Sequence, residues 1–241
     1  MTGVNASAAA PRPLAEQAAS NLLHPLTLAL LALTFSTGTV DAVSYLGLGH
    51  VFTANMTGNV VLLGFGIAGA GGLPVVAPIV SMAAFAIAAG IGGVLARHLA
   101  DRHPRHVAWA LGLETGLLAA AAILVAVTHP HPTTVAGDVT IALMAAAMGI
   151  RNATVRRIGV PDLTTTVLTL TLTGLAADST IAGGSGKGSM RRTSAIVAML
   201  AGAVAGALML RTGLTLPLAF GAALAVATAV GYLSVTRARA A

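Results

Sequence analysis

The stretch TGTVDAVSYLGLGHVFTANMTGNVVLLG, residues 37–64, decides how this chain folds. It places an acid, a histidine, two asparagines and many glycines and threonines between apolar runs. Residues 149–174, GIRNATVRRIGVPDLTTTVLTLTLTG, repeat this pattern less closely. Polar groups inside apolar segments are costly unless they face a cavity or a partner, so we expect both stretches to occupy special positions in the fold.

The composition of the chain sets its class. Of the 241 residues, 56% are hydrophobic and only 8% are charged, and the mean hydropathy is +0.88. A soluble domain carries about 25% charged residues, so this chain cannot cover a water-facing surface and lipid must be its solvent. In lipid only helices and closed barrels satisfy their backbone, and the apolar stretches lack the alternation of barrel strands. We predict an all-α, polytopic membrane helix bundle.

Eight apolar segments follow an alanine-rich tail, residues 1–23, which we expect to be disordered. The segments cover residues 25–46, 52–68, 75–95, 107–127, 139–155, 163–177, 195–210 and 214–235. Segments 52–68 and 163–177 are short, because about 15 helical residues span only about 22 Å of a hydrocarbon core of roughly 30 Å. We expect residues 24–236 to form a single transmembrane domain in which these two segments are the doubtful crossings.

The basic residues decide between two topologies. If all eight segments cross, the 13 Lys and Arg residues divide almost evenly between the two sides. If segments 52–68 and 163–177 enter and return, every basic residue except Arg211 lies on the side of the termini. Because cytoplasmic loops carry the excess of Lys and Arg, we predict six crossings plus two short re-entrant or broken helices. Both termini are then cytoplasmic, and the protein lies in the inner (plasma) membrane. The alternative is eight crossings, arranged as two parallel repeats of four.

The two halves of the domain, residues 25–128 and 136–235, read as a two-fold internal repeat. The interval that separates Asp41 from Asn152 also separates Thr53 from Thr164 and Asn55 from Thr166. Three crossings per half make inverted repeats, and four make parallel repeats. Two glycine pairs at similar positions in the halves are expected to be close contacts between helices. These pairs are Gly90/Gly93 and Gly202/Gly206.

The polar stretches also carry a family resemblance. VDAVSYLGLGHVFTANMTGNVV in the first half and GIRNATVRRIGVPDLTTTVLTLTLTG in the second resemble the YoaK family of bacterial membrane proteins. The Asn-Met-Thr-Gly-Asn block at residues 55–59 is the most specific part of the match. The resemblance implies a multi-pass membrane protein and brings no established activity, so the function must be argued from the residues.

Asp41 is the sharpest functional candidate, because a carboxylate within a membrane segment tends to face a cavity, a partner or a proton path. Asn55, Thr57 and Asn59 follow a glycine-rich turn at the start of the short second segment. A helix start offers free N–H donors and a partial positive charge, so this group could bind an anion or a dipolar solute. Equally, Asn55 could be a plain helix cap, and Asp41 could cap a helix end or lie in a wet loop.

In the second half, Asn152, Thr164 and Thr166 take the corresponding positions. Arg151 could bind an anionic group, pair with an acid, or extend to the membrane interface. Glu114, in the fourth segment, could take up a proton, pair with an arginine such as Arg151, or face the interface. We therefore expect a solute or ion site that is shared by the two halves. Its predicted binding residues are Asp41, Asn55, Thr57, Asn59, Arg151, Asn152, Thr164 and Thr166, and its proton-coupling candidates are Asp41 and Glu114.

These features favour a transporter or channel for a small solute or ion over an enzyme. The alternatives are a membrane enzyme for an apolar or lipid-linked substrate, and a non-catalytic scaffold. Without cysteine, a thiol nucleophile and a thiolate metal site are excluded, and no motif asks for a cofactor or a metal. The basic residues are spread over several loops, so we expect no nucleic-acid partner. The expected partners are the lipid bilayer and the solute, and a homo-oligomer stays open.

Overall fold

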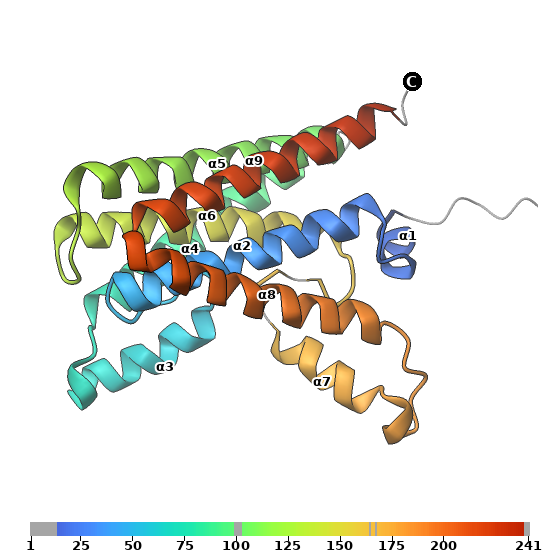
Figure 1. Cartoon of the computed structure of the whole chain (residues 1–241), viewed down its shortest axis with the longest axis horizontal. Coiled ribbons are helices and arrows are strands. Elements are labelled where there is room, and N and C mark those ends of the chain that lie inside the picture. Colours follow the sequence, from blue (N-terminus) through green and yellow to red (C-terminus); the bar gives the residue numbers. More distant parts are fainter. Residues whose placement is uncertain (1–13, 99–102, 164, 167, 239–241) are drawn as a thin grey trace, which may run out of the picture.

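A computed structural model of the chain describes residues 14–98, 103–163, 165–166 and 168–238. These residues form helices and turns without a strand, which confirms the all-α prediction. Six of the described helices are 21 to 26 residues long and run side by side (Figure 1). They are α2 (Pro25–Gly47), α4 (Val76–His98), α5 (His103–Thr128), α6 (Val135–Ile158), α8 (Ser189–Met209) and α9 (Thr215–Ala238).

Five of the long helices are long and apolar enough to cross a membrane: α2, α4, α5, α8 and α9. Helix α6 has the same length but carries an acid in its first turn and three arginines in its second half. Large apolar side chains also point outward from the bundle. Ile87, Ile123 and Val230 are each exposed by more than 60%. Such an outer surface suits lipid and not water, so the bundle is that of a membrane protein.

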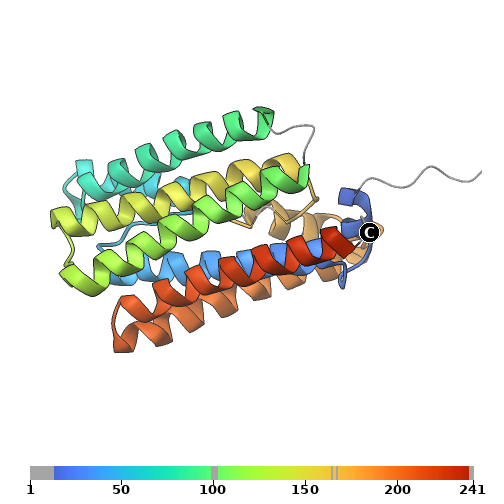
Figure 2. The ribbon, with the colours of Figure 1, turned by 90° about the horizontal axis from the view of Figure 1, so that it is seen from above.

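Two short helices do not run the length of the bundle. Helix α3 (Met56–Ile67) begins near the middle and ends at the end where α2 stops, and α7 (Thr169–Ala177) begins near the middle and ends at the opposite end (Figure 1). Helix α1 (Leu14–Ser20) and the end of α9 lie together at one end in both views (Figures 1 and 2). We call this the terminal end, and the other the far end. The chain therefore passes along the bundle six times, with two re-entrant helices, and the eight-crossing alternative does not describe it.

The positions of the basic residues agree with this arrangement. Arg97 ends α4 and Arg156 and Arg157 end α6, all at the terminal end. Arg211 lies at the far end, in the 3-10 turn η3 (Leu210–Thr212) between α8 and α9. Because α2 and α6 run in opposite directions, the two halves of the chain are inverted repeats.

The first helix of each repeat packs against helices of the other repeat, so the two first helices are exchanged. Helix α2 packs along α8, and α6 packs along α4, while α5 and α9 pack on each other. The first helix of each half has one glycine at this close contact. A Cβ atom on Gly38 of α2 would overlap the backbone of Met199 in α8, and a Cβ atom on Gly149 of α6 would overlap the backbone of Phe85 in α4. These glycines are separated by the same interval as Asp41 and Asn152, so the internal repeat is structural.

The expected glycine contacts are half right. Gly202 and Gly206 of α8 lie against the backbone of α2, as predicted. Gly90 and Gly93 of α4 have open space around them, so that part of the prediction is wrong. The close contact of α4 uses Gly92, which faces α6. Because residues on a helix share a face only at intervals of three or four, a shift of one or two positions moves a glycine off the contact.

The apolar core lies between α2, α5, α6 and α9, at the centre of the bundle. Its largest fully buried side chains include Val40, Val43, Leu118, Met144, Met148 and Leu218. At the terminal end α1 packs on α2, and the Thr27 hydroxyl donates to the Ala18 carbonyl at 2.7 Å. Part of the tail that was expected to be disordered is therefore helical.

Cysteine accessibility tests the re-entrant arrangement directly, because the chain has no native cysteine. We expect Ala70→Cys and Ser185→Cys to be labelled by a membrane-impermeant maleimide from opposite sides of the membrane. Ala70 lies at the far end after α3, and Ser185 lies in the loop before α8 at the terminal end. Both residues are exposed. Labelling of both cysteines from the same side would contradict the six-crossing arrangement.

Candidate functional site

Asp41 holds the first re-entrant segment in place. Its Oδ1 atom accepts hydrogen bonds from the Thr53 and Ala54 N–H groups, each at 3.0 Å, and from the Thr53 hydroxyl at 3.4 Å. These residues lie just before α3, where the chain has returned from the far end to the middle. One carboxylate oxygen thus satisfies backbone donors that would otherwise be unpaired within the membrane.

Asn59 fixes the same segment from the other side. Its Oδ1 accepts from the Phe52 N–H at 2.9 Å, and its Nδ2 donates to the Phe52 carbonyl at 2.7 Å. The Ser81 hydroxyl of α4 donates to that carbonyl as well. Asn55 is the N-cap of α3 and accepts from the Gly58 N–H at 3.3 Å. Asn59 is fully buried, so its amide group serves the backbone, whereas Asn55 is partly exposed.

The second re-entrant segment is fastened by Asn152. Its Nδ2 donates to the Met148 carbonyl at 2.9 Å, and its Oδ1 accepts from the Thr166 hydroxyl at 2.6 Å. Asn152 of α6 thus contacts the second re-entrant segment from the position that Asp41 of α2 has in the first half, but through a threonine hydroxyl. Thr164, the predicted counterpart of Thr53, lies outside the residues that the structure describes.

Ion pairs also anchor α7, at the terminal end. Arg191 pairs with Asp162 at 2.6 Å, and Arg192 pairs with Asp162 at 3.1 Å and with Asp178 at 2.8 Å. The Arg192 guanidinium also donates to the Gly174 carbonyl at 2.6 Å. Two arginines at the start of α8 therefore hold both ends of the second re-entrant segment.

An open groove lies between the two re-entrant segments. It consists of two adjoining hollows of about 490 and 500 Å³, which share Tyr45, Phe52, Asn55, Thr166 and Met199 in their lining. The first hollow extends along α2 and α8, and the second extends between α3 and the start of α7. In Figure 1, α3 and α7 diverge from the middle of the bundle on the side next to α8. The groove therefore includes the mid-length region where the two halves meet and extends along α2 and α8 toward the far end.

The groove wall combines aromatic, small and polar groups. The rings of Tyr45 and Phe52 stack with centroids 4.9 Å apart. Helix α8 contributes Met199, Ala203 and other apolar residues. Predicted site residues complete the lining: Asp41, Asn55, Thr57 and Thr166.

Asp41 gives the groove its charge. Among the described residues that line the two hollows, it is the only Asp, Glu, Lys, Arg or His. Its Oδ2 atom has no hydrogen-bond partner among the described residues, in contrast to Oδ1. The groove therefore offers a solute one negative oxygen beside neutral hydrogen-bonding groups.

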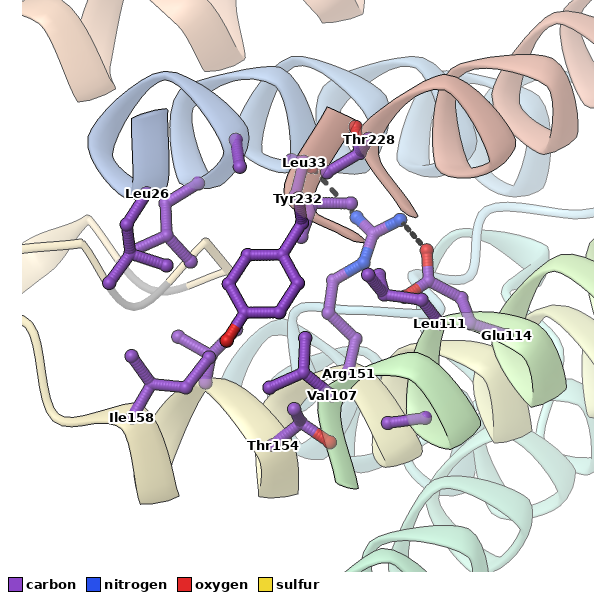
Figure 3. A pocket seen from close by; sticks show the side chains of 14 residues that line it. Leu26, Leu33, Val107, Leu111, Glu114, Arg151, Thr154, Ile158, Thr228 and Tyr232 are labelled. Carbon is purple, nitrogen blue, oxygen red and sulfur yellow. Dashed lines mark hydrogen bonds and ion pairs between the residues drawn. The ribbon is translucent and has the colours of Figure 1, made fainter. Parts of the chain in front are cut away.

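Arg151 and Glu114 form a separate, buried cluster (Figure 3). Each is 1% exposed, and the Arg151 Nη2 atom pairs with Glu114 Oε1. The Nη2 atom also donates to the Ser36 hydroxyl at 3.2 Å, and Nη1 donates to the Leu33 carbonyl at 2.7 Å and the Thr37 hydroxyl at 2.8 Å. The guanidinium of α6 thus joins α5 to the middle of α2.

A cavity of about 20 Å³ lies beside this pair, lined mostly by apolar side chains such as Leu111 and Tyr232 (Figure 3). It shares no lining residue with the groove. The structure therefore brings Arg151 and Glu114 together, as one of the alternatives expected. Neither lines the groove with Asp41 and Asn55, although Arg151 is near enough to interact electrostatically with Asp41. Asn59 and Asn152 lie behind the groove and support its two segments.

Sequence reasoning missed several residues that complete these sites. Tyr45 and Phe52 line the groove, and Ser36 and Thr37 bind Arg151. For Tyr45 a signal existed: Gly38, Asp41 and Tyr45 follow each other at intervals of three and four residues, which places them on one face of a helix.

The fold and the groove define a polytopic helical membrane protein with inverted repeats and a polar groove at mid-length. The chain belongs to the family described as "Protein of unknown function (DUF1275)", whose model matches residues 29–231. It is also similar to UPF0700 transmembrane protein YoaK of Bacillus subtilis (strain 168), which confirms the family resemblance. The identity is 36% over 153 residues, which make up 63% of this chain and 65% of that protein. The alignment thus spans a little less than two thirds of the relative. No solved structure matches the chain.

Proposed function

We propose that the protein is a transporter or channel for a small solute or ion, which binds in the groove between the two re-entrant segments. The observation that carries the proposal is the groove itself, lined by Asp41 and Asn55 from one half and Thr166 from the other. In transporters built from inverted repeats, sites lie near the bilayer midplane where interrupted helices of the two repeats meet. A groove at this place suits binding and release of a solute without covalent chemistry, so we propose no enzymatic reaction.

Asp41 is the residue that would couple transport to protons. It is partly buried, it touches the groove, and only one of its carboxylate oxygens is engaged by the backbone. Glu114, the other candidate, has Arg151 as its partner and lies outside the groove. We propose that the protein lies in the inner membrane of the cell. The terminal end of the bundle would face the cytoplasm, because the basic loops gather at that end.

Transport can be tested with the purified protein in liposomes that contain the pH indicator pyranine. We expect at least one solute of a panel of amines, amino acids, sugars and carboxylates to enter and to change the internal pH. Asp41→Asn is expected to abolish the pH change, because an amide cannot take up a proton. Asparagine keeps an oxygen for the Thr53 and Ala54 N–H groups, so the re-entrant segment should stay in place.

Asp138→Asn is the matched control. Asp138 lies in the first turn of α6 at the far end and does not line the groove, so this variant should transport as the unaltered protein does. If Asp41→Asn leaves the pH change intact, Asp41 has no part in coupling. If no solute of the panel enters through the unaltered protein, the transport proposal fails for these classes.

A further inference from the structure

We infer that the groove binds a monovalent organic cation with an apolar body. The inference builds on the proposed function, because it names the class of solute for the same groove. It rests on the charge of the groove, on its walls and on its rim.

The charge of the groove is that of one carboxylate. Asp41 is the only formally charged residue in the lining, and its Oδ2 atom has no hydrogen-bond partner among the residues that the structure describes. Three of the N–H groups on this side are already occupied, because Asp41 binds those of Thr53 and Ala54 and Asn55 binds that of Gly58. A cation next to Oδ2 supplies the missing partner and neutralises a charge that is costly at this depth.

The walls of the groove suit the apolar body of such a cation. The stacked rings of Tyr45 and Phe52 lie in both hollows, and a ring face attracts a cation most strongly when water is excluded. Helix α8 adds the apolar side chains of Met199, Ala203 and Ala207 to the lining. Among the described residues, no group of three or more His, Cys, Asp or Glu side chains is placed to hold a metal ion.

The rim of the groove is apolar as well. Leu46, Val61 and Val204 line the groove and are themselves exposed by 61%, 49% and 51%. These residues lie on α2, α3 and α8, and Leu46 is in the last turn of α2, at the far end of the bundle. A solute that enters here meets hydrocarbon-like surface before it reaches Asp41, which favours an organic cation over a hydrophilic one.

The test uses tritiated tetraphenylphosphonium with the purified full chain in detergent micelles, and tetraphenylborate as an anion of nearly the same shape. We expect saturable binding of about one tetraphenylphosphonium per chain. Asp41→Asn should weaken it about tenfold or more, because a charge pair in a partly dry site contributes at least about 1.4 kcal/mol. Asp138→Asn should bind as the unaltered protein does, and tetraphenylborate should not compete.

Three outcomes would overturn the inference. These are no saturable binding above that of empty micelles, equal binding by Asp41→Asn and the unaltered protein, and tighter binding of tetraphenylborate. The last result would place an anion at the start of α7, where no side chain caps the helix. Binding is measured in micelles, without any flux across a membrane. Tetraphenylphosphonium can therefore bind even if the transport assay gives no flux. Conversely, the protein can transport another class of solute even if tetraphenylphosphonium does not bind.

Discussion

Glu114→Leu is expected to lower the free energy of unfolding by about 3–5 kcal/mol, since it leaves the buried Arg151 without its counter-charge. Arg151 is 1% exposed, and its guanidinium cannot lose its charge by releasing a proton. The neutral acceptors Leu33, Ser36 and Thr37 would remain, but none carries a negative charge. The measurement is the unfolding of the purified protein in mixed micelles as the fraction of denaturing detergent is raised.

The reverse change, Arg151→Met, should cost less, because the Glu114 carboxylate left behind can take up a proton. The double variant Glu114→Leu with Arg151→Met should recover most of the loss, since apolar side chains of similar size often replace a buried ion pair at little cost. A double-mutant cycle over these variants gives the interaction energy of the pair. If both single changes and the double change cost the same, the pair does not hold α5, α6 and α2 together.

Gly202→Ala is expected to destabilise the protein by about 1–3 kcal/mol or more, because the added methyl group would overlap the Phe35 carbonyl of α2. This neighbour is backbone and not a flexible side chain, so α2 and α8 would have to move apart. The effect should appear as a loss of folded protein in the same unfolding measurement. Gly149→Ala should act alike at the α6–α4 contact, where the neighbour is the Phe85 carbonyl.

Gly90→Ala is the control for these glycine changes. Gly90 is also inside a long helix, but a Cβ atom there would meet open space. Alanine should therefore be neutral or stabilise by about 0.5–1 kcal/mol, because it loses less conformational freedom on folding. A loss of stability with Gly90→Ala as large as with Gly202→Ala would mean that the two effects come from helix composition and not from the α2–α8 contact.

The topology could be predicted from the sequence because it depends on sums over many residues. The basic residues gather on one side only if segments 52–68 and 163–177 return without crossing, and this is how α3 and α7 lie. The internal repeat pointed the same way through Asp41 and Asn152, each of which accepts a hydrogen bond from its re-entrant segment. An error in the interpretation of one residue would not have changed the topology that either observation predicts.

The division of the polar residues into separate sites could not be predicted. Glu114 and Arg151 lie on different helices, and only the packing of α5, α6 and α2 shows that they face each other and not the groove. Asn55 and Asn59 are neighbours in one block, yet one lines the groove and the other holds Phe52. Which side of a short helix faces a hollow depends on tertiary contacts that a local pattern does not contain.

The exchanged packing of α2 and α6 has a consequence for biosynthesis. The long helices of one half barely touch one another, and their extensive contacts are all with the other half. When the ribosome has delivered α2 to α5 to the membrane, Gly38 and Gly92 still face lipid, since α8 and α6 are not yet made. The nascent first half therefore remains in the bilayer as loosely associated helices until the second half is inserted. Two separately synthesised halves should each be prone to degradation and should protect each other when they are produced together.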